Sequence, residues 1–192
     1  MFNTFKTYIQ AQADLSDEEV QQMYDLATER SLRRKEMLLQ EGEICRYKVF
    51  IAKGLLRTYR IKEDGSEHII QFSPENGWTV EPESYDKVIP TAYNIDALEA
   101  SELLLWTKKD FVDLQESIPK LKSFSQRVIS NSTYIIRERV YSAISSSAEE
   151  KYDEFVKQHP SLFARVPLHM VASYLGVSRE TLSRIRIAQV GR

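Results

Sequence analysis

The chain has 192 residues and a formal net charge of −2, with 42% hydrophobic and 28% charged residues, as expected of a globular protein with one good core plus a small second one. No apolar run approaches the roughly 20 residues of a membrane helix, and the N-terminus lacks a signal-peptide core, so we expect a cytoplasmic protein with no membrane partner. Cys45 is the single cysteine, which excludes a disulfide framework and a cysteine cluster for zinc or iron–sulfur.

The N-terminal region predicts one or more surface helices over residues 14–33. Ser16 is a candidate N-cap because Glu19 follows three residues later, which is the spacing of a capping box. The apolar side of this region would consist of residues at helical spacing, namely Val20, Met23, Tyr24 and Ala27.

From Lys35 onward, short strands separated by glycines are predicted. The candidate strands are residues 49–51, 55–61, 68–72, 93–98 and 103–106. The pair Asp64-Gly65 lies between the second and third of them and is a strong hairpin signal. Many short strands joined by turns indicate a small antiparallel barrel or jelly roll.

The strand region also holds candidates for an effector pocket. An apolar pocket would be lined by Trp78, Tyr85 and Tyr93, with Arg57 or Thr91 as polar anchors. The same aromatic residues would equally serve to fill the barrel core, and both interpretations stay open.

Metal-dependent enzyme chemistry is disfavoured by the histidine content. A metal-dependent cupin enzyme needs several histidines and a carboxylate inside its barrel. The chain has three histidines, His68, His159 and His169, and only His68 lies in the strand region. We therefore expect no metal, no cofactor and no enzymatic activity.

Helices return after the strand region. Thr107 and Asp110 resemble a capping box, and Pro119 opens a long helix that runs to about Ser147. Its apolar residues predict pairing with a second copy of the same helix in a homodimer, through Leu121, Phe124, Val128 and Ile135. The alternative is that this helix packs on its own barrel.

A helix, a glycine turn and a second helix are predicted over residues 167–186. Pro167 suits the first turn of the first helix, whose apolar stripe consists of Leu168, Val171, Ala172 and Leu175. Gly176 can adopt the left-handed conformation that ends a helix, and Ser178 is a good N-cap for the next one. Such a pair can place its second helix in the major groove of DNA.

The second helix carries side chains suited to DNA. Leu182 and Ile185 would face inward. Arginine pairs with guanine edges and glutamate accepts from cytosine, so base reading is predicted for Arg179, Glu180 and Arg184. Phosphate contacts are predicted for Ser178, Thr181, Ser183 and Arg186. The alternative is an ordinary helical hairpin with solvated charges.

The charge distribution favours the DNA interpretation. Residues 165–192 carry five arginines and one acid, Glu180, for a charge of about +4, which leaves about −6 for residues 1–164. A basic end on a mildly acidic protein is the expected electrostatic footprint for nucleic acid. The sequence therefore predicts a transcription regulator that binds double-stranded DNA.

A barrel, a long helix and a helix–turn–helix in this order resemble the Crp/Fnr family of bacterial transcription regulators. The resemblance covers most of the chain from about residue 35, and its most specific part is Ser178-Arg179-Glu180-Thr181-Leu182-Ser183-Arg184-Ile185. Gly42, Gly54, Gly65 and the segment 95–99 also resemble the family pattern. The resemblance implies a homodimer on a roughly palindromic operator, a small-molecule effector in a cyclic-nucleotide-binding-like barrel, and RNA polymerase as a further candidate partner.

Two departures from the family pattern modify these expectations. Cyclic-nucleotide-binding members have a Gly-Glu pair and an Arg-Ser or Arg-Thr pair, whereas this chain has Gly77-Trp78 and Pro90-Thr91. Residues 70–106 contain seven acids and only Lys87 as a cation, so a buried cyclic phosphate would lack a cationic partner and we expect no tight binding of cAMP or cGMP. The chain ends at Arg192, so we expect no C-terminal wing and a DNA affinity that depends strongly on salt.

The predicted fold class is α+β, with an antiparallel β-barrel or jelly roll, flanking helices, a long dimerisation helix and a small all-α helix–turn–helix domain. The expected division is a sensor domain at 1–118, a dimerisation helix and hinge at 119–147, and a truncated DNA-binding domain at 148–192. The alternative function is a non-enzymatic ligand-sensing or protein-interaction module whose DNA head is degenerate.

Overall fold

The structure is a computed structural model that describes residues 1–190. Its contacts divide the chain into two compact units, Met1–Arg60 with Gln71–Ile129, and Ile61–Ile70 with Ser130–Arg192. The long helix α5 (Pro119–Ser145) contributes residues to both units. The three-part division with boundaries after residues 118 and 147 stays a prediction.

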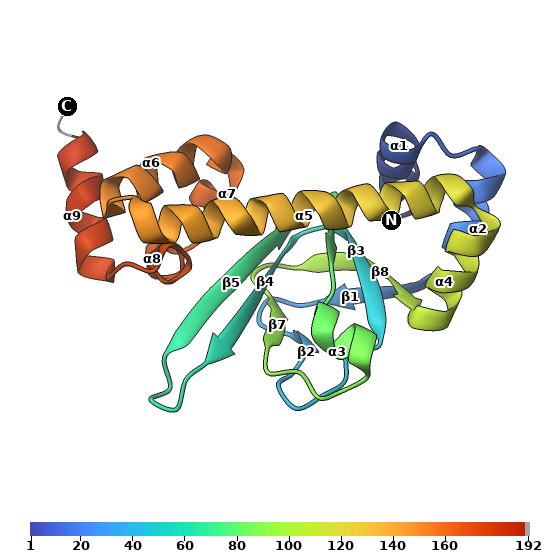
Figure 1. The fold of residues 1–192 in the computed structure, drawn as a ribbon, viewed down its shortest axis with the longest axis horizontal. Helices are drawn as coiled ribbons and strands as arrows, with labels where there is room; N and C mark the ends of the chain where they lie inside the picture. Colours follow the sequence, from blue (N-terminus) through green and yellow to red (C-terminus); the bar gives the residue numbers. More distant parts are fainter. Residues whose placement is uncertain (191–192) are drawn as a thin grey trace. The chain divides into compact units, whose positions relative to one another are not determined.

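The first unit is built on two four-stranded antiparallel sheets (Figure 1). The strand order of the first sheet is β1 (Thr28–Leu32), β8 (Ser101–Thr107), β3 (Tyr47–Lys53) and β6 (Gly77–Thr79). The order of the second sheet is β2 (Met37–Leu39), β7 (Asn94–Ala97), β4 (Leu55–Ile61) and β5 (Glu67–Pro74). The predicted α+β class with antiparallel sheets is confirmed.

The central strands β3 and β8 of the first sheet are buried on both faces, and Leu103 to Trp106 of β8 form a continuous apolar run. In β3, Val49 and Ile51 face the second sheet, where they join residues such as Leu56 and Ile95 in one hydrophobic cluster. The alternate residues Phe50 and Ala52 belong to a second cluster on the outer face. Because side chains in a strand alternate between faces, one strand serves both cores.

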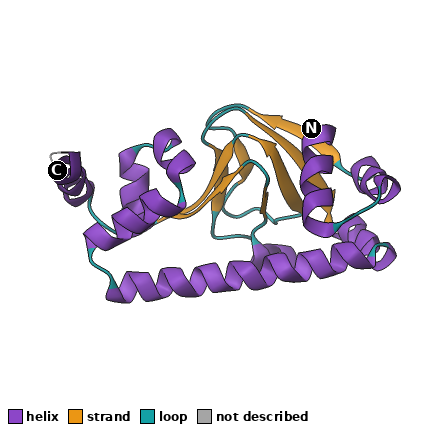
Figure 2. Ribbon diagram, turned by 90° about the horizontal axis from the view of Figure 1, so that it is seen from above, coloured by secondary structure: helices purple, strands orange, loops and turns teal. Residues whose placement is uncertain are grey.

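Helices cover the outer face of the first sheet (Figure 2, helices purple and strands orange). They are α1 (Phe2–Ala13), α2 (Asp17–Asp25), α4 (Lys108–Ser117) and the start of α5. Aromatic rings fill the interface. The ring of Trp78 lies 5.4 Å from those of Phe50 and Trp106, and the Trp106 indole nitrogen donates to the Met23 carbonyl at 2.7 Å. Buried aromatic pairs of this kind stabilise the fold beyond their burial alone.

Local signals in the sequence define several helix starts. The predicted capping box is confirmed, because Ser16 accepts from the Glu19 amide and Glu19 accepts from the Ser16 amide. Thr107 likewise accepts from the Asp110 amide at the start of α4. The predicted extension of the first helical region to residue 33 is wrong, since Thr28–Leu32 forms β1, which pairs with β8.

The β4–β5 hairpin has its turn at the predicted Asp64-Gly65 pair, where the Lys62 amide donates to the Ser66 carbonyl at 3.0 Å. A different glycine, Gly54 between β3 and β4, is required by space as well as by its φ of +103°, because a Cβ there would overlap Ser101. The pairing of β3 with β8 thus brings the turn at Gly54 against the start of β8.

The second unit contains the tip of the β4–β5 hairpin (residues 61–70, called the hairpin tip below), the C-terminal part of α5 and four further helices. These helices, in orange and red in Figure 1, are α6 (Ala148–Gln158), α7 (Pro160–Arg165), α8 (Leu168–Leu175) and α9 (Arg179–Val190). Its small core holds Tyr152, Phe155, Leu162, Val171 and Leu182. Within residues 1–190 no helix has the length and apolarity that crossing a membrane requires.

The hairpin tip is bonded to α8 within this unit. The Ser173 hydroxyl accepts from the Ile69 amide at 3.0 Å and donates to the Glu67 carbonyl at 2.8 Å. Arg139 of α5 donates to the Ile70 carbonyl at 2.6 Å, and its guanidinium lies 4.1 Å from the Tyr174 ring centre. Three elements distant in sequence are therefore linked by side-chain to backbone contacts.

Candidate nucleic-acid interface and ligand pocket

Helices α8 and α9 are joined by a tight turn at Gly176, which has the left-handed conformation with φ 68°. The Val177 amide donates to the Ala172 carbonyl and the Gly176 amide to the Ser173 carbonyl, the two bonds of a Schellman motif. Ser178 then accepts from the Thr181 amide at 3.1 Å and starts α9. These local bonds fix the angle at which α9 leaves the turn.

Burial on α9 separates a packed side from an exposed side. Leu182 is fully buried and Ile185 is half-buried. The residues predicted to read bases, Arg179, Glu180 and Arg184, are all exposed. Since residues three or four apart share a side of a helix, Glu180 and Arg184 are neighbours on this surface.

The predicted phosphate-binding residues lie at the edges of the exposed side. Ser178 and Arg186 are exposed, whereas Thr181 and Ser183 are half-buried. Burial raises the pKa of Tyr152 in α6, and the positive charge of Arg186 opposes that shift. Arg192, counted in the basic segment, lies outside the described residues.

Acids of the described residues leave the guanidinium groups of α9 unpaired. Among residues 1–190, no carboxylate forms an ion pair with Arg179, Arg184 or Arg186. The contact seen for Arg184 is a long one, 3.5 Å from its Nη2 to the Thr181 hydroxyl. The donors of these side chains are thus directed to solvent, where an anionic ligand can reach them.

The five residues predicted to line an effector pocket do not all belong to one cluster. Trp78 belongs to the outer hydrophobic cluster and Tyr85 to the cluster between the sheets. Thr91 is buried and accepts from the Tyr93 amide at 3.0 Å, and Tyr93 lies 6.0 Å from the guanidinium of Arg60. Trp78 and Tyr85 therefore fill cores.

Arg57 is held in a buried ion pair. Its Nε donates to one oxygen of Asp96 at 2.7 Å and its Nη2 to the other at 3.0 Å, and its guanidinium lies 4.0 Å from the Tyr59 ring centre. Arg57 and Asp96 are exposed by only 7% and 5%. The charge of Arg57 is therefore compensated within the barrel.

The short helix α3 (Pro82–Lys87) has its N-terminus occupied by a side chain of the protein. Glu81 is buried, and its carboxylate accepts from the amides of Glu83 at 3.3 Å and Ser84 at 2.8 Å. These are the backbone donors that would otherwise be directed at a bound anion. The Glu81 carboxylate therefore satisfies the donors at the start of α3.

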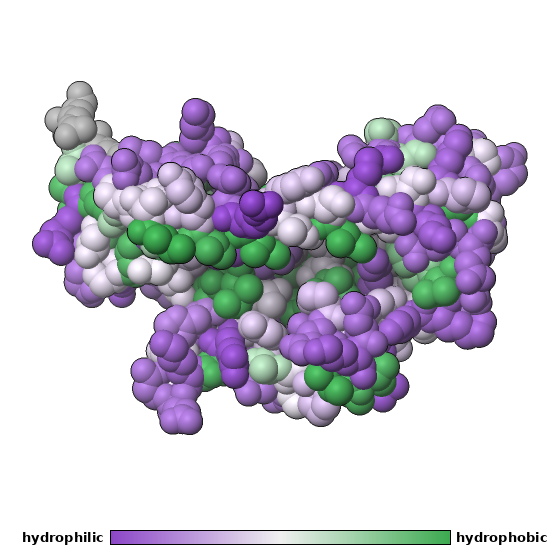
Figure 3. Space-filling view, viewed as in Figure 1, coloured by the Kyte–Doolittle hydropathy of each residue, from purple (hydrophilic) through white to green (hydrophobic). Residues whose placement is uncertain are grey.

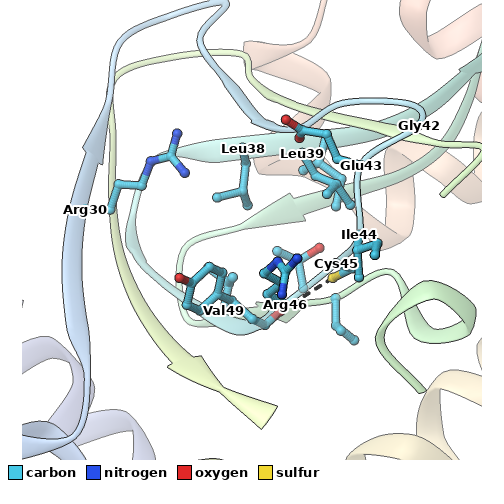
Figure 4. Close-up of a pocket in the computed structure, with 13 residues that line it drawn as sticks. Arg30, Leu38, Leu39, Gly42, Glu43, Ile44, Cys45, Arg46 and Val49 are labelled. Carbon is cyan, nitrogen blue, oxygen red and sulfur yellow. Dashed lines mark hydrogen bonds between the residues drawn. The ribbon is translucent and has the colours of Figure 1, made fainter. Parts of the chain in front are cut away.

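A cavity of about 490 Å³ opens elsewhere in the first unit (Figure 4). Its walls come from β1, β2, the segment from Gly42 to Tyr47, and the ends of β3, β6 and β7. The cationic side chains among its lining residues are Arg30 and Arg46, and the acid is Glu43. None of the five predicted pocket residues lines it.

The sequence offered no signal for this cavity, because Arg30 lies in a stretch predicted as helix and Arg46 precedes the first predicted strand. Only the pairing of β1 with β8 and of β2 with β7 brings the walls of the cavity together.

The sequence analysis also did not single out Ile187 of α9. Its side chain is 70% exposed, and it follows Glu180 by seven residues, on the same side of the helix.

The predicted dimerisation helix divides into two parts. Leu121 and Phe124 are buried in the outer core of their own chain and Val128 packs partly against it, so these residues cover their own barrel. Ile135 is 62% exposed. An exposed apolar stripe follows the C-terminal half of α5 (green in Figure 3). It includes Ile129, Ile136, Val140 and Ile144.

Comparison with known proteins supplies a match for the first unit. Residues 29–117 match the family model of the cyclic nucleotide-binding domain. This segment contains α3, α4 and both sheets apart from Thr28, the first residue of β1. The matched domain thus holds the Arg57–Asp96 pair, the Glu81-capped helix and the cavity.

Several relatives extend over most of the chain. The regulatory protein HlyX of Actinobacillus pleuropneumoniae is 24% identical, over 89% of this chain and 75% of its own length. The structure of FixK2 from Bradyrhizobium japonicum matches with a TM-score of 0.73 and 17% identity, over 86% of this chain and 84% of that one. A protein of Eubacterium rectale, described as a transcriptional regulator of the Crp/Fnr family, matches with a TM-score of 0.72 and 15% identity, over 96% and 88% of the two chains. At these identities the structural likeness establishes the fold.

Proposed function

We propose that this chain is a DNA-binding transcription regulator of the Crp/Fnr type that acts as a homodimer and has no enzymatic role. The observation that carries the proposal is the set of exposed guanidinium groups on α9, which form no ion pair with acids among residues 1–190. The helix itself is joined to α8 by a tight turn. The names of HlyX and of the Eubacterium rectale protein, both regulators, support the same function. RNA polymerase is the further partner proposed for such a regulator.

In this proposal α9 lies in the major groove, with Arg179 and Arg184 paired to guanines and Glu180 accepting from cytosine. Phosphate contacts from Ser178, Thr181, Ser183 and Arg186 set the position of the helix. The exposed side chain of Ile187 adds an apolar contact suited to a thymine methyl group. A homodimer would present two such helices to a palindromic operator.

The exposed stripe on α5 is the proposed dimer contact. Ile129, Ile136, Val140 and Ile144 are spaced by seven or four residues, and each is at least 54% exposed. Exposed apolar residues repeated on one side of a long helix are the pattern that a partner helix covers. This set replaces the buried Leu121 and Phe124 as the proposed dimer residues.

Selection of bound fragments from a genomic library tests the proposal. We expect enrichment of a palindromic site, and Arg179→Ala should lose about 1–3 kcal/mol of discrimination at one base pair of each half-site. Arg34→Ala removes an equally exposed arginine outside α9 and should keep the preference. If the wild type enriches no fragment, including the region upstream of its own gene, the alternative of a protein-interaction module with a degenerate DNA head is favoured.

A further inference from the structure

The cavity beside β1 and β2 joins a cationic rim to an apolar floor. Its apolar lining residues are Leu38, Leu39, Val49, Val80 and Ile95. Of these, Leu39, Val49 and Ile95 are buried members of the cluster between the sheets. A ligand in this cavity would therefore place its apolar body against the core of the domain, and about 490 Å³ is within the range of small-molecule sites.

Two guanidinium groups stand at the cavity. In Figure 4, Arg30 enters from β1 and Arg46 from the segment that leads into β3. Arg30 is half-buried, and its Nη2 donates to the Met37 carbonyl at 3.0 Å, which holds the side chain in place and leaves its other donors available. Arg46 is exposed, and no carboxylate among residues 1–190 forms an ion pair with it.

The acidic and thiol groups at the cavity leave its lining with a net positive charge, since two arginines face one carboxylate, that of Glu43. The Glu43 carboxylate accepts from the Gln40 amide at 2.9 Å and so closes the turn before the cavity. Cys45 is buried, and its thiol lies 3.6 Å from the Tyr47 carbonyl. Burial raises the pKa of the Cys45 thiol, which keeps this group neutral at physiological pH.

We infer that this cavity is a binding site for a small organic anion with a carboxylate head and an apolar body. The carboxylate pairs with Arg30 and Arg46, because guanidinium forks match the two oxygens of a carboxylate. The apolar body lies on Leu39, Val49 and Ile95. No residue of α3 lines the cavity, so this site is distinct from the Glu81-capped start of that helix.

Isothermal titration of the full chain, without DNA, tests the inference, and its outcome does not depend on whether the protein binds an operator. The probe is octanoate, compared with 1-octanol, octylamine and acetate. We expect saturable binding of octanoate, with affinity at least about tenfold weaker for octanol, because the charged hydrogen bonds are lost. Octylamine should bind no better than octanol, and acetate, which lacks the apolar body, should bind more weakly than octanoate.

Octanoate binding should weaken about tenfold or more in Arg30→Gln and in Arg46→Gln. The control is Arg34→Gln, which should leave octanoate binding unchanged because Arg34 is exposed on the turn after β1 and does not line the cavity. In the Arg46→Gln variant octanol binding should be retained, which distinguishes loss of the anion contact from loss of the fold. The inference is overturned if octanoate does not saturate the wild type, if octanol binds equally well, or if both arginine variants bind as the wild type does.

Discussion

Two buried carboxylates determine which groups of the barrel remain available to a ligand. Asp96 accepts two hydrogen bonds from Arg57, and Glu81 accepts two from the backbone at the start of α3. The guanidinium and the helix end that could hold an anion are thus already satisfied by the chain. Cations with free donors are found at the cavity instead, on Arg30 and Arg46.

Removing one member of the buried pair should destabilise the fold strongly. Asp96→Asn leaves the Arg57 charge buried without its counter-charge, so we expect the free energy of unfolding to fall by about 3–5 kcal/mol. Urea unfolding followed by circular dichroism measures this, with the exposed Glu116→Gln expected to change stability by under about 0.5 kcal/mol. A loss below about 1 kcal/mol for Asp96→Asn would show that the pair is not held as described.

Cyclic nucleotides should bind this chain poorly despite the match of residues 29–117 to the cyclic nucleotide-binding domain. A cyclic phosphate would have to displace the Glu81 carboxylate from the start of α3 and would meet the compensated Arg57. Calorimetric titration with cAMP and cGMP should give dissociation constants weaker than micromolar. A micromolar or tighter constant for either nucleotide would refute this prediction.

At the scale of elements, local sequence signals were sufficient to predict the helix caps and turns whose hydrogen bonds join residues close in sequence. The caps at Ser16, Thr107 and Ser178 and the turns at Gly65 and Gly176 each depend on atoms within a few residues of one another. Strands β3, β4, β5, β7 and β8 and the long helix α5 followed from these signals together with hydrophobic periodicity. The exposed side of α9 followed from the same 3.6-residue period.

Prediction from the sequence was wrong or incomplete where an element is stabilised by residues far away in the chain. Thr28–Leu32 is mostly polar and has the pattern of the end of a helix, yet it pairs with β8, where Leu32 lies opposite Ser101 and Thr28 opposite Leu105. Helix α1 was not predicted, although Phe5 and Ile9 are fully buried against the first sheet. The cavity was missed for the same reason, since tertiary pairing overrides local preference in sheets.

The contact between the hairpin tip and α8 can be tested at this scale. Ser173→Ala removes both hydrogen bonds to Glu67 and Ile69, and the buried Ile69 amide loses its acceptor. We expect a loss of about 1–3 kcal/mol and faster hydrogen exchange in residues 61–70, measured by mass spectrometry. Ser161→Ala, at an exposed position in α7, should change neither. Unchanged exchange at the hairpin in Ser173→Ala would contradict the contact.

For the whole molecule, dimerisation should depend on the exposed half of α5. Ile136 and Val140 are 58% and 54% exposed, so Ile136→Glu with Val140→Glu should leave the monomer folded while placing like charges in the proposed interface. Sedimentation velocity should show a dimer for the wild type and a monomer for the double variant. Asn131→Glu adds a charge off the stripe and should stay dimeric. A double variant that remains a dimer would place the interface elsewhere.

The basic C-terminal segment on an otherwise acidic chain makes the electrostatic part of DNA binding dependent on a small number of arginines. Each phosphate contact contributes about 0.9 to the slope of log affinity against log salt concentration, so Arg186→Gln in a dimer should reduce that slope by about two. The loss of affinity should be the same for operator and unrelated DNA, because a phosphate contact carries no sequence information.

Arg179→Ala should instead lower the affinity for operator DNA selectively. Anisotropy titrations over a range of KCl concentrations measure both effects, with the exposed Lys122→Gln as control. A loss for Arg186→Gln that is confined to the operator would reassign Arg186 from phosphate binding to base reading.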